Sequence, residues 1–205
     1  MIGNDQSQLS VASLSRKKQL AFALLIFERM LSSLIAFSKD TGFDDSCYLQ
    51  AKDAAWATLQ NGSVDRSISE ACLSGVPDTE DYSHDLISSA LNAALAAIDI
   101  IAFTQDGCAE HIMTVSTLAG DSLYLYLSGL EGSVISSPEE DSQIASDTLM
   151  QEEYQRQEAD IRFLASLPEQ LSDEAILSLR ARADTQASLL PLPDLYDPAT
   201  LWLHF

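Results

Sequence analysis

The chain has 205 residues, 46% of them hydrophobic, and its 31 acidic and 11 basic side chains give a formal net charge of −20. This apolar content is enough to bury the core of one large domain, which excludes an intrinsically disordered acidic chain. Residues 67–155 contain sixteen carboxylates and no Lys or Arg, so the basic patch that nucleic acid and anionic lipid require is missing there. We therefore expect no nucleic-acid partner and no membrane partner.

The polar residues 1–13 predict a flexible N-terminus, and an all-helical domain is expected over residues 14–188. Its first helix is predicted from about Leu14 to Lys39, because apolar residues recur there at helical spacing and cover most of its faces. Gly42 supplies a left-handed stop, and Phe43 is expected to pack back on the helix end. This helix should form the buried centre of the domain.

Capping and stop signals delimit three further helices in the next part of the chain. Each begins at an Asp or Ser and ends near a Gly or an Asn-Gly or Asp-Gly pair. The predicted ranges are about 44–60, 63–73 and 81–105.

The C-terminal part predicts helices over about 108–128, 142–167 and 172–188, with a loop rich in Gly, Ser and acidic residues at 129–141. The prolines in the apolar tail 189–205 exclude a regular element there. The predicted fold class is therefore all-α, an irregular antiparallel helical bundle of about seven helices with a Pro-rich, apolar C-terminal tail. Whether this extended tail packs on its own bundle or on a second subunit stays open.

Two apolar runs and three cysteines bear on the compartment. The run 20–27 follows basic residues, as in a signal peptide, but it stops after eight residues without a cleavage site. The run 86–103 approaches the length of a membrane span, but two polar residues interrupt it. Cys47, Cys72 and Cys108 are an odd, widely spaced set, which fits a reducing compartment. We expect a cytoplasmic protein.

Polar side chains recur at intervals of seven residues in and after the predicted helix 81–105, at Asp85, Asn92, Asp99 and Asp106. This spacing predicts one narrow polar seam, which is either a solvent face or a site for a cation or for Arg29. Glu28 and Arg29 interrupt the apolar run of the first helix, and an inter-helix ion pair is the favoured interpretation. A speculative ligand or ion-pair site therefore consists of Glu28, Arg29, Asn92 and Asp99.

Three short motifs resemble catalytic or metal-binding patterns. The run 81–85 contains two Asp and one His, and Cys108 and His111 are three residues apart, but neither set supplies the four ligands that zinc requires. Residues 120–123 read Gly-Asp-Ser-Leu, a hydrolase signature, yet their serine is expected within a helix rather than after a strand. We assign no catalytic, cofactor-binding or metal-binding residue.

Several segments occur in an order and spacing that are typical of one bacterial family. They are Phe27-Glu28-Arg29-Met30, Phe37, Thr41-Gly42-Phe43-Asp44, Trp56-Ala57-Thr58-Leu59, His111 with Val115 and Ser116, Glu152-Glu153-Tyr154 and Ile161-Arg162-Phe163-Leu164. On these segments the chain resembles the YjaG-like family, domain of unknown function 416, from about Leu14 to Arg182. Asn92 stands where an Asp is usual in that family. The resemblance implies an all-helical cytoplasmic protein and supplies no activity.

Three hypotheses for the function remain open. The favoured one is a non-catalytic protein that acts through contacts with a protein partner or with itself as a homodimer, because no complete catalytic set is present. The second is a small-ligand-binding protein or enzyme with a pocket between helices 14–39 and 81–105. The third is an acidic mimic of nucleic acid, which needs its carboxylates gathered on one surface that faces a basic protein.

Overall fold

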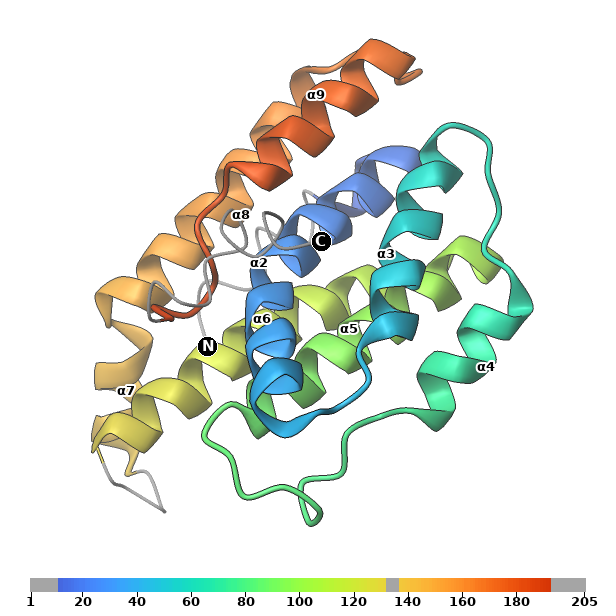
Figure 1. The fold of residues 1–205 in the computed structure, drawn as a ribbon. Coiled ribbons are helices and arrows are strands. Elements are labelled where there is room, and N and C mark those ends of the chain that lie inside the picture. Colours follow the sequence, from blue (N-terminus) through green and yellow to red (C-terminus); the bar gives the residue numbers. More distant parts are fainter. Residues whose placement is uncertain (1–10, 132–136, 193–205) are drawn as a thin grey trace.

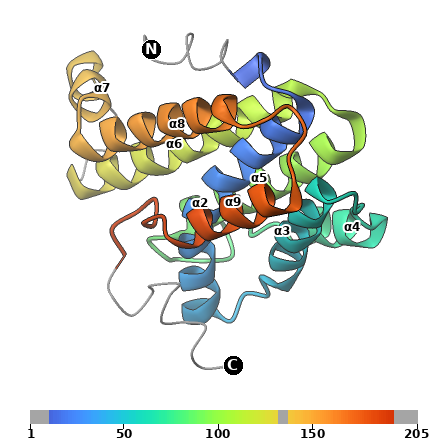
Figure 2. The same cartoon turned by 90° about the horizontal axis from the view of Figure 1, so that it is seen from above.

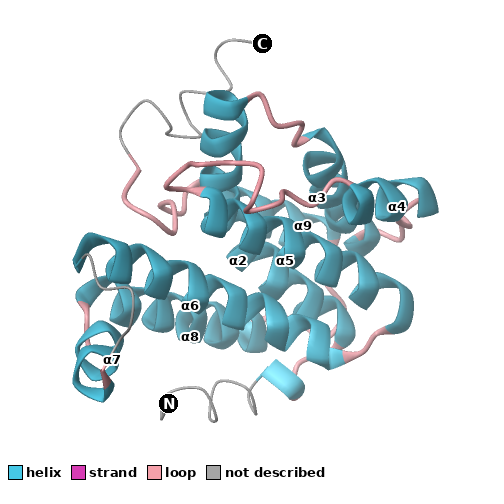
Figure 3. Ribbon diagram, turned by 90° about the horizontal axis from the view of Figure 1, so that it is seen from below, coloured by secondary structure: helices cyan, strands magenta, loops and turns pink. Residues whose placement is uncertain are grey.

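The computed structural model describes residues 11–131 and 137–192, and within these ranges it contains helices and loops but no strand (Figures 1 and 3). The all-α prediction is therefore confirmed. Eight helices are described: α2 (Arg16–Thr41), α3 (Ser46–Leu59), α4 (Arg66–Ser74), α5 (Ile87–Asp106), α6 (Ala109–Glu131), α7 (Pro138–Ala145), α8 (Thr148–Ser166) and α9 (Asp173–Asp184).

Helix α2 is the centre of the bundle. It contacts α3, α5, α6, α8 and α9, and it lies between the α5–α6 pair and the α8–α9 pair (Figures 1 and 2). Most of its large apolar side chains are buried, among them Phe22, Phe27 and Phe37. A helix that is apolar on most faces must be surrounded by other helices, since each exposed apolar face loses the free energy of burial.

The predicted end of α2 is confirmed. Gly42 has φ 76° and donates its backbone N–H to the Ser38 carbonyl, which closes the last turn. The Phe43 ring packs back on Phe37, with 5.5 Å between ring centroids. The same left-handed stop recurs at Gly107, with φ 73°, where α5 ends.

Two helix boundaries differ from the sequence prediction. The helix expected from residue 81 begins only at Ile87, because the side chain of His84 accepts a hydrogen bond from the Leu86 N–H and holds that segment in a loop. Asp85 therefore precedes α5 and does not belong to a seam on it. The helix predicted over 142–167 is two helices, because Asp147 accepts from the Leu149 N–H and begins α8 as a new helix.

The predicted loop 129–141 is shorter than expected. Helix α6 continues to Glu131, and α7 already begins at Pro138. Ser137 and Glu140 form a reciprocal capping box at that start, with Pro at the first helical position, which is a strong helix-start signal.

The start of the C-terminal tail packs on its own chain. Leu189 and Leu190 are buried, and the Leu189 N–H donates to the Arg29 carbonyl at 2.9 Å. The rest of the predicted tail, 193–205, and most of the predicted flexible N-terminus, 1–10, lie outside the described residues.

Helices α2 and α5 are long and apolar enough to cross a bilayer by length and composition alone. Core helices of soluble proteins pass the same test. In α2, 89% of the most apolar stretch is buried inside the protein, and in α5 the corresponding share is 56%.

Candidate functional site

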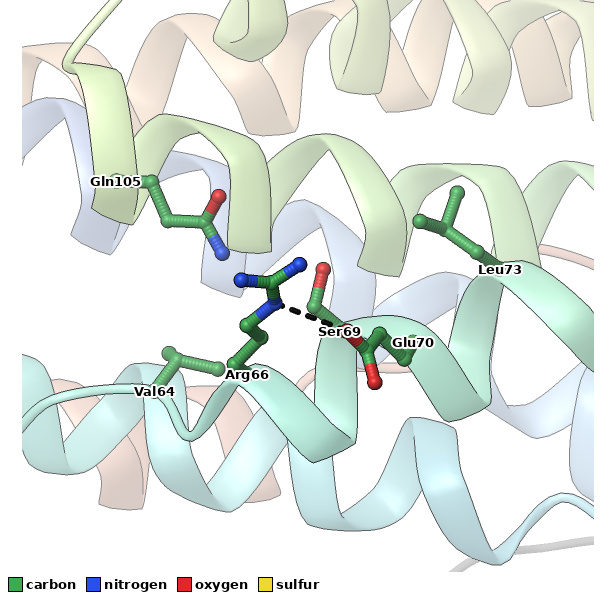
Figure 4. A pocket seen from close by; sticks show the side chains of 6 residues that line it. All are labelled: Val64, Arg66, Ser69, Glu70, Leu73 and Gln105. Carbon is green, nitrogen blue, oxygen red and sulfur yellow. Dashed lines mark hydrogen bonds and ion pairs between the residues drawn. The ribbon is translucent and has the colours of Figure 1, made fainter.

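A depression of about 490 Å³ opens between α4 and the C-terminal end of α5. We call it the α4 groove, and its lining residues are Val64, Arg66, Ser69, Glu70, Leu73 and Gln105. Side chains from α4 project toward α5, and Gln105 points back toward Arg66 (Figure 4). The Asp65 side chain begins α4 by accepting from the Ser67 N–H at 2.7 Å.

The α4 groove combines charged, polar and apolar groups. Arg66 Nε donates to Glu70 Oε1 at 2.9 Å, and both side chains are largely exposed. Leu73 is 59% exposed. One cation, one carboxylate, one hydroxyl, one amide and two apolar side chains suit hydrogen bonding and apolar contact with another molecule. The sequence analysis missed this groove, although the Arg66–Glu70 spacing marked a helix surface with an ion pair.

Arg29 lies in α2, within a buried polar network. Its Nε and Nη2 donate to the two carboxylate oxygens of Glu153 at 3.0 and 2.7 Å, a bidentate pair. Its Nη1 donates to Asp160 at 2.9 Å and to Gln186 at 2.6 Å. Arg29, Glu153 and Asp160 are all at most 1% exposed. The structure thus places Arg29 in an inter-helix ion pair that joins α2 to α8.

Two further contacts balance this network. Arg182 donates to the second oxygen of Asp160 through Nε and Nη2, at 3.0 and 2.8 Å. The guanidinium groups of Arg29 and Arg182 therefore donate hydrogen bonds to these two carboxylates, and Arg156 Nη1 lies 3.9 Å from Glu153. Burial lowers the pKa of Arg29, but Glu153 and Asp160 outweigh this effect and the net shift raises it. Arg29 stays charged, and its four hydrogen bonds hold α2, α8 and the segment after α9 together.

Glu28 points to a different helix. Trp56 Nε1 donates to its carboxylate at 2.9 Å, and Lys52 Nζ lies 3.6 Å from the other oxygen. Burial raises the pKa of Glu28, and Lys52 and Trp56 act against this shift. Glu28 therefore joins α2 to α3, whereas Arg29 joins α2 to α8.

Asn92 and Asp99 both face α6. Asn92 Nδ2 donates to Ser122 Oγ at 3.1 Å, in a buried position. Asp99 accepts from His111 Nδ1 at 2.6 Å. The four residues proposed from the sequence therefore have separate partners, and no hydrogen bond found among the described residues joins two of them.

The hydrolase-like motif has no catalytic arrangement around its serine. Ser122 is 1% exposed in the middle of α6, where its hydroxyl donates to the Leu118 carbonyl and accepts from Asn92. His84 lies in the loop before α5, 3.4 Å from Asp40. Nucleophile and base must be within hydrogen-bond reach of one another, and these two side chains contact other partners.

His111 lies between two carboxylates at the α5–α6 corner. Besides Asp99, its Nε2 contacts Asp106 Oδ2 at 3.2 Å. Asp106 also accepts from the Cys108 N–H, and Arg16 lies near enough to lower the pKa of Asp106 further. The hydrogen bond to Asp99 is the main reason that the pKa of His111 is raised. Among the residues that the structure describes, no group of three or more His, Cys, Asp or Glu side chains is placed to hold a metal ion.

The raised pKa of His111 predicts a pH-dependent contribution to stability. The contribution is complete below about pH 6.5, the pKa of the unfolded side chain, and is lost as pH rises through the higher folded-state pKa. At pH 6 the variant His111→Asn should have a free energy of unfolding on the order of 1 kcal/mol lower than that of the wild type. This figure allows for the weakening of a partly exposed ion pair by the solvent. Urea unfolding of both proteins at pH 6 and pH 9 measures this difference, which should shrink at the higher pH. A difference that is constant or grows with pH would contradict this assignment.

Comparisons with known proteins identify relatives of this chain. The sequence model of the family described as DUF416, protein of unknown function, matches residues 6–188. A solved structure of a DUF416 family protein from Shewanella baltica OS155 has a TM-score of 0.80 and 18% sequence identity to this chain, and the match covers 89% of this chain and 95% of that chain. No curated protein matches the sequence. At this identity the solved structure establishes the shared fold only.

Proposed function

This chain belongs to the DUF416 family, whose function is unknown, and we propose that it is a non-catalytic cytoplasmic protein that binds another protein through the α4 groove. The observation that carries this proposal is Leu73, a large apolar side chain left 59% exposed beside the charged pair Arg66 and Glu70. An apolar anchor with a polar rim is the usual composition of a protein interface.

The contacts of the other polar candidates support this assignment. Glu28 and Arg29 direct their side chains to partners on α3, α8 and the segment after α9. Asn92 is similarly occupied by Ser122. These groups act in helix packing, because a buried polar group is tolerated only when its hydrogen bonds are made. The α4 groove, by contrast, presents its polar groups to solvent.

The charge of the chain favours a basic partner. Residues 67–155, which include most of α4, carry sixteen carboxylates and no Lys or Arg. A second copy of the chain would bring the same net charge of −20, and like charges repel. A basic protein segment with one apolar side chain would complement both the acidic chain and Leu73. We therefore propose a basic protein partner, with the homodimer as the alternative.

Replacing Leu73 with Asp should weaken partner binding by about tenfold or more, because it removes the apolar anchor and adds an unpaired charge to the interface. Leu177→Asp is the matched control, since Leu177 is 61% exposed on α9 and does not line the groove. The measurement is quantitative capture of partner proteins from the native cytoplasm on the wild type and on each variant, followed by affinity titration of the protein that is captured.

Three outcomes distinguish the alternatives. Loss of one basic protein with Leu73→Asp, and not with Leu177→Asp, is expected. If the wild type, Leu73→Asp and Leu177→Asp all captured the same partner equally well, the assignment of the groove would be overturned. Sedimentation velocity of the purified chain tests the homodimer, because a dimer that Leu73→Asp converts to a monomer would identify the second copy as the partner.

A further inference from the structure

Two of the three cysteines meet between α3 and α4. Cys47 lies in the first turn of α3 and is half-buried, whereas Cys72 is the buried residue of α4. Cys47 Sγ lies against the end of α4, 3.9 Å from the position that a Cβ on Gly75 would take, and each thiol is near enough to shift the pKa of the other. The neighbouring residue Tyr48 donates its hydroxyl to the Cys72 carbonyl at 3.1 Å, which fixes α4 against the start of α3. The sequence predicted no disulfide framework, because the three cysteines are an odd, widely spaced set.

We propose that Cys47 and Cys72 are a redox modification site, at which a peroxide oxidant forms a reversible intramolecular disulfide that links α3 to α4. The two cysteines belong to segments that already contact each other, because the Tyr48 hydroxyl is hydrogen-bonded to the Cys72 carbonyl and the two helices pack together. In a reducing compartment most cysteines stay reduced, and the disulfides that form there are usually transient. This inference concerns a different chemistry from the α4 groove and does not depend on it.

The reaction proceeds in two balanced steps. The sulfur of Cys47 attacks one oxygen of hydrogen peroxide, the O–O bond breaks, and the departing oxygen takes up a proton and leaves as water, which gives a sulfenic acid on Cys47. The sulfur of Cys72 then attacks the Cys47 sulfur, and the hydroxyl group leaves as a second water with the proton of Cys72. Two thiols lose two electrons, and one peroxide is reduced to two waters.

The surroundings assign the two roles. Cys47 is reachable from solvent and is the residue that meets the oxidant, whereas Cys72 is buried and resolves the sulfenic acid. Burial raises the pKa of both thiols, that of Cys72 to about 12, and Asp44 adds to the effect on Cys47. Because the thiolate is the nucleophile, the rate should rise about tenfold for each pH unit between pH 7 and 8.

The test uses the full chain, reduced, freed of reductant and exposed to hydrogen peroxide. Remaining thiols are then alkylated, and the intact mass and the proteolytic peptides are measured. The expected product has lost two hydrogen atoms, carries one alkylated cysteine at Cys108, yields a peptide pair that joins Cys47 to Cys72, and reverts with dithiothreitol.

Single variants make the result specific. Cys108→Ser should still form the disulfide, whereas Cys47→Ser should lose it completely. Cys47 is only half-buried, so this variant should fold, and circular dichroism checks that it does. The proposal would be overturned if the wild type gave only sulfinic or sulfonic acids, or only disulfides between chains through the exposed Cys108.

Discussion

Replacing Arg29 with Met should lower the free energy of unfolding by about 3–5 kcal/mol, because it leaves two buried carboxylates without their shared cation. Glu153 loses both of its guanidinium hydrogen bonds, and Asp160 keeps only the contacts from Arg182 and Gln186. Met fills a similar volume, so lost packing contributes little. Urea unfolding of the wild type and the variant at neutral pH measures the difference.

A second substitution separates the ionic effect from packing. In the double variant Arg29→Met with Glu153→Gln, the bidentate partner no longer carries a charge, so part of the lost stability should return. Arg29→Lys keeps the charge but cannot form the planar bidentate pair, and it should fall between the wild type and Arg29→Met. If Arg29→Met were as stable as the wild type, the network would not be what joins α2 to α8.

Truncating Leu24 to Ala should cost about 2–5 kcal/mol, because Leu24 is fully buried in α2 and its removal leaves a cavity among helices that pack on every side. The effect is expected to be large because α2 contacts five other helices and has little freedom to collapse into the space. Thermal and urea unfolding both measure it.

The matched control for this substitution is Leu73→Ala. The same atoms are removed from a side chain that is 59% exposed, and the expected change is within about 0.5 kcal/mol. A large loss of stability from Leu73→Ala would show that Leu73 supports the fold, and would weaken its assignment as a binding residue. A small loss from Leu24→Ala would contradict the central position of α2.

The sequence predicted the helices well where periodicity and stop signals agree. Helix α2 was recognised from apolar spacing, and its end from Gly42, whose left-handed conformation few other residues adopt. The boundaries failed where a polar side chain changed the local structure. His84 and Asp147 each accept a backbone N–H hydrogen bond, and such local bonds compete with a continuous helix in a way that apolar spacing does not reveal.

The candidate sites were harder to predict for two reasons. The type of partner for Arg29 was predictable, but Glu153 lies 124 residues away, and the chain offers 31 carboxylates to choose from. In α4, Ala71, Cys72 and Leu73 are three apolar residues in succession, and only packing against α3 decides that Cys72 is buried and Leu73 is exposed. The proximity of Cys47 and Cys72 follows from the same packing.

Site-specific photo-cross-linking at residue 73 tests the central claim most directly. A photoreactive phenylalanine analogue replaces Leu73 in one variant and Leu177 in the other, and both proteins are irradiated within the cells that produce this chain. We expect residue 73, and not residue 177, to become linked to one basic protein, which mass spectrometry then identifies. Equal cross-linking at both positions, or none at residue 73, would contradict the proposal that this protein acts by binding a partner in the α4 groove.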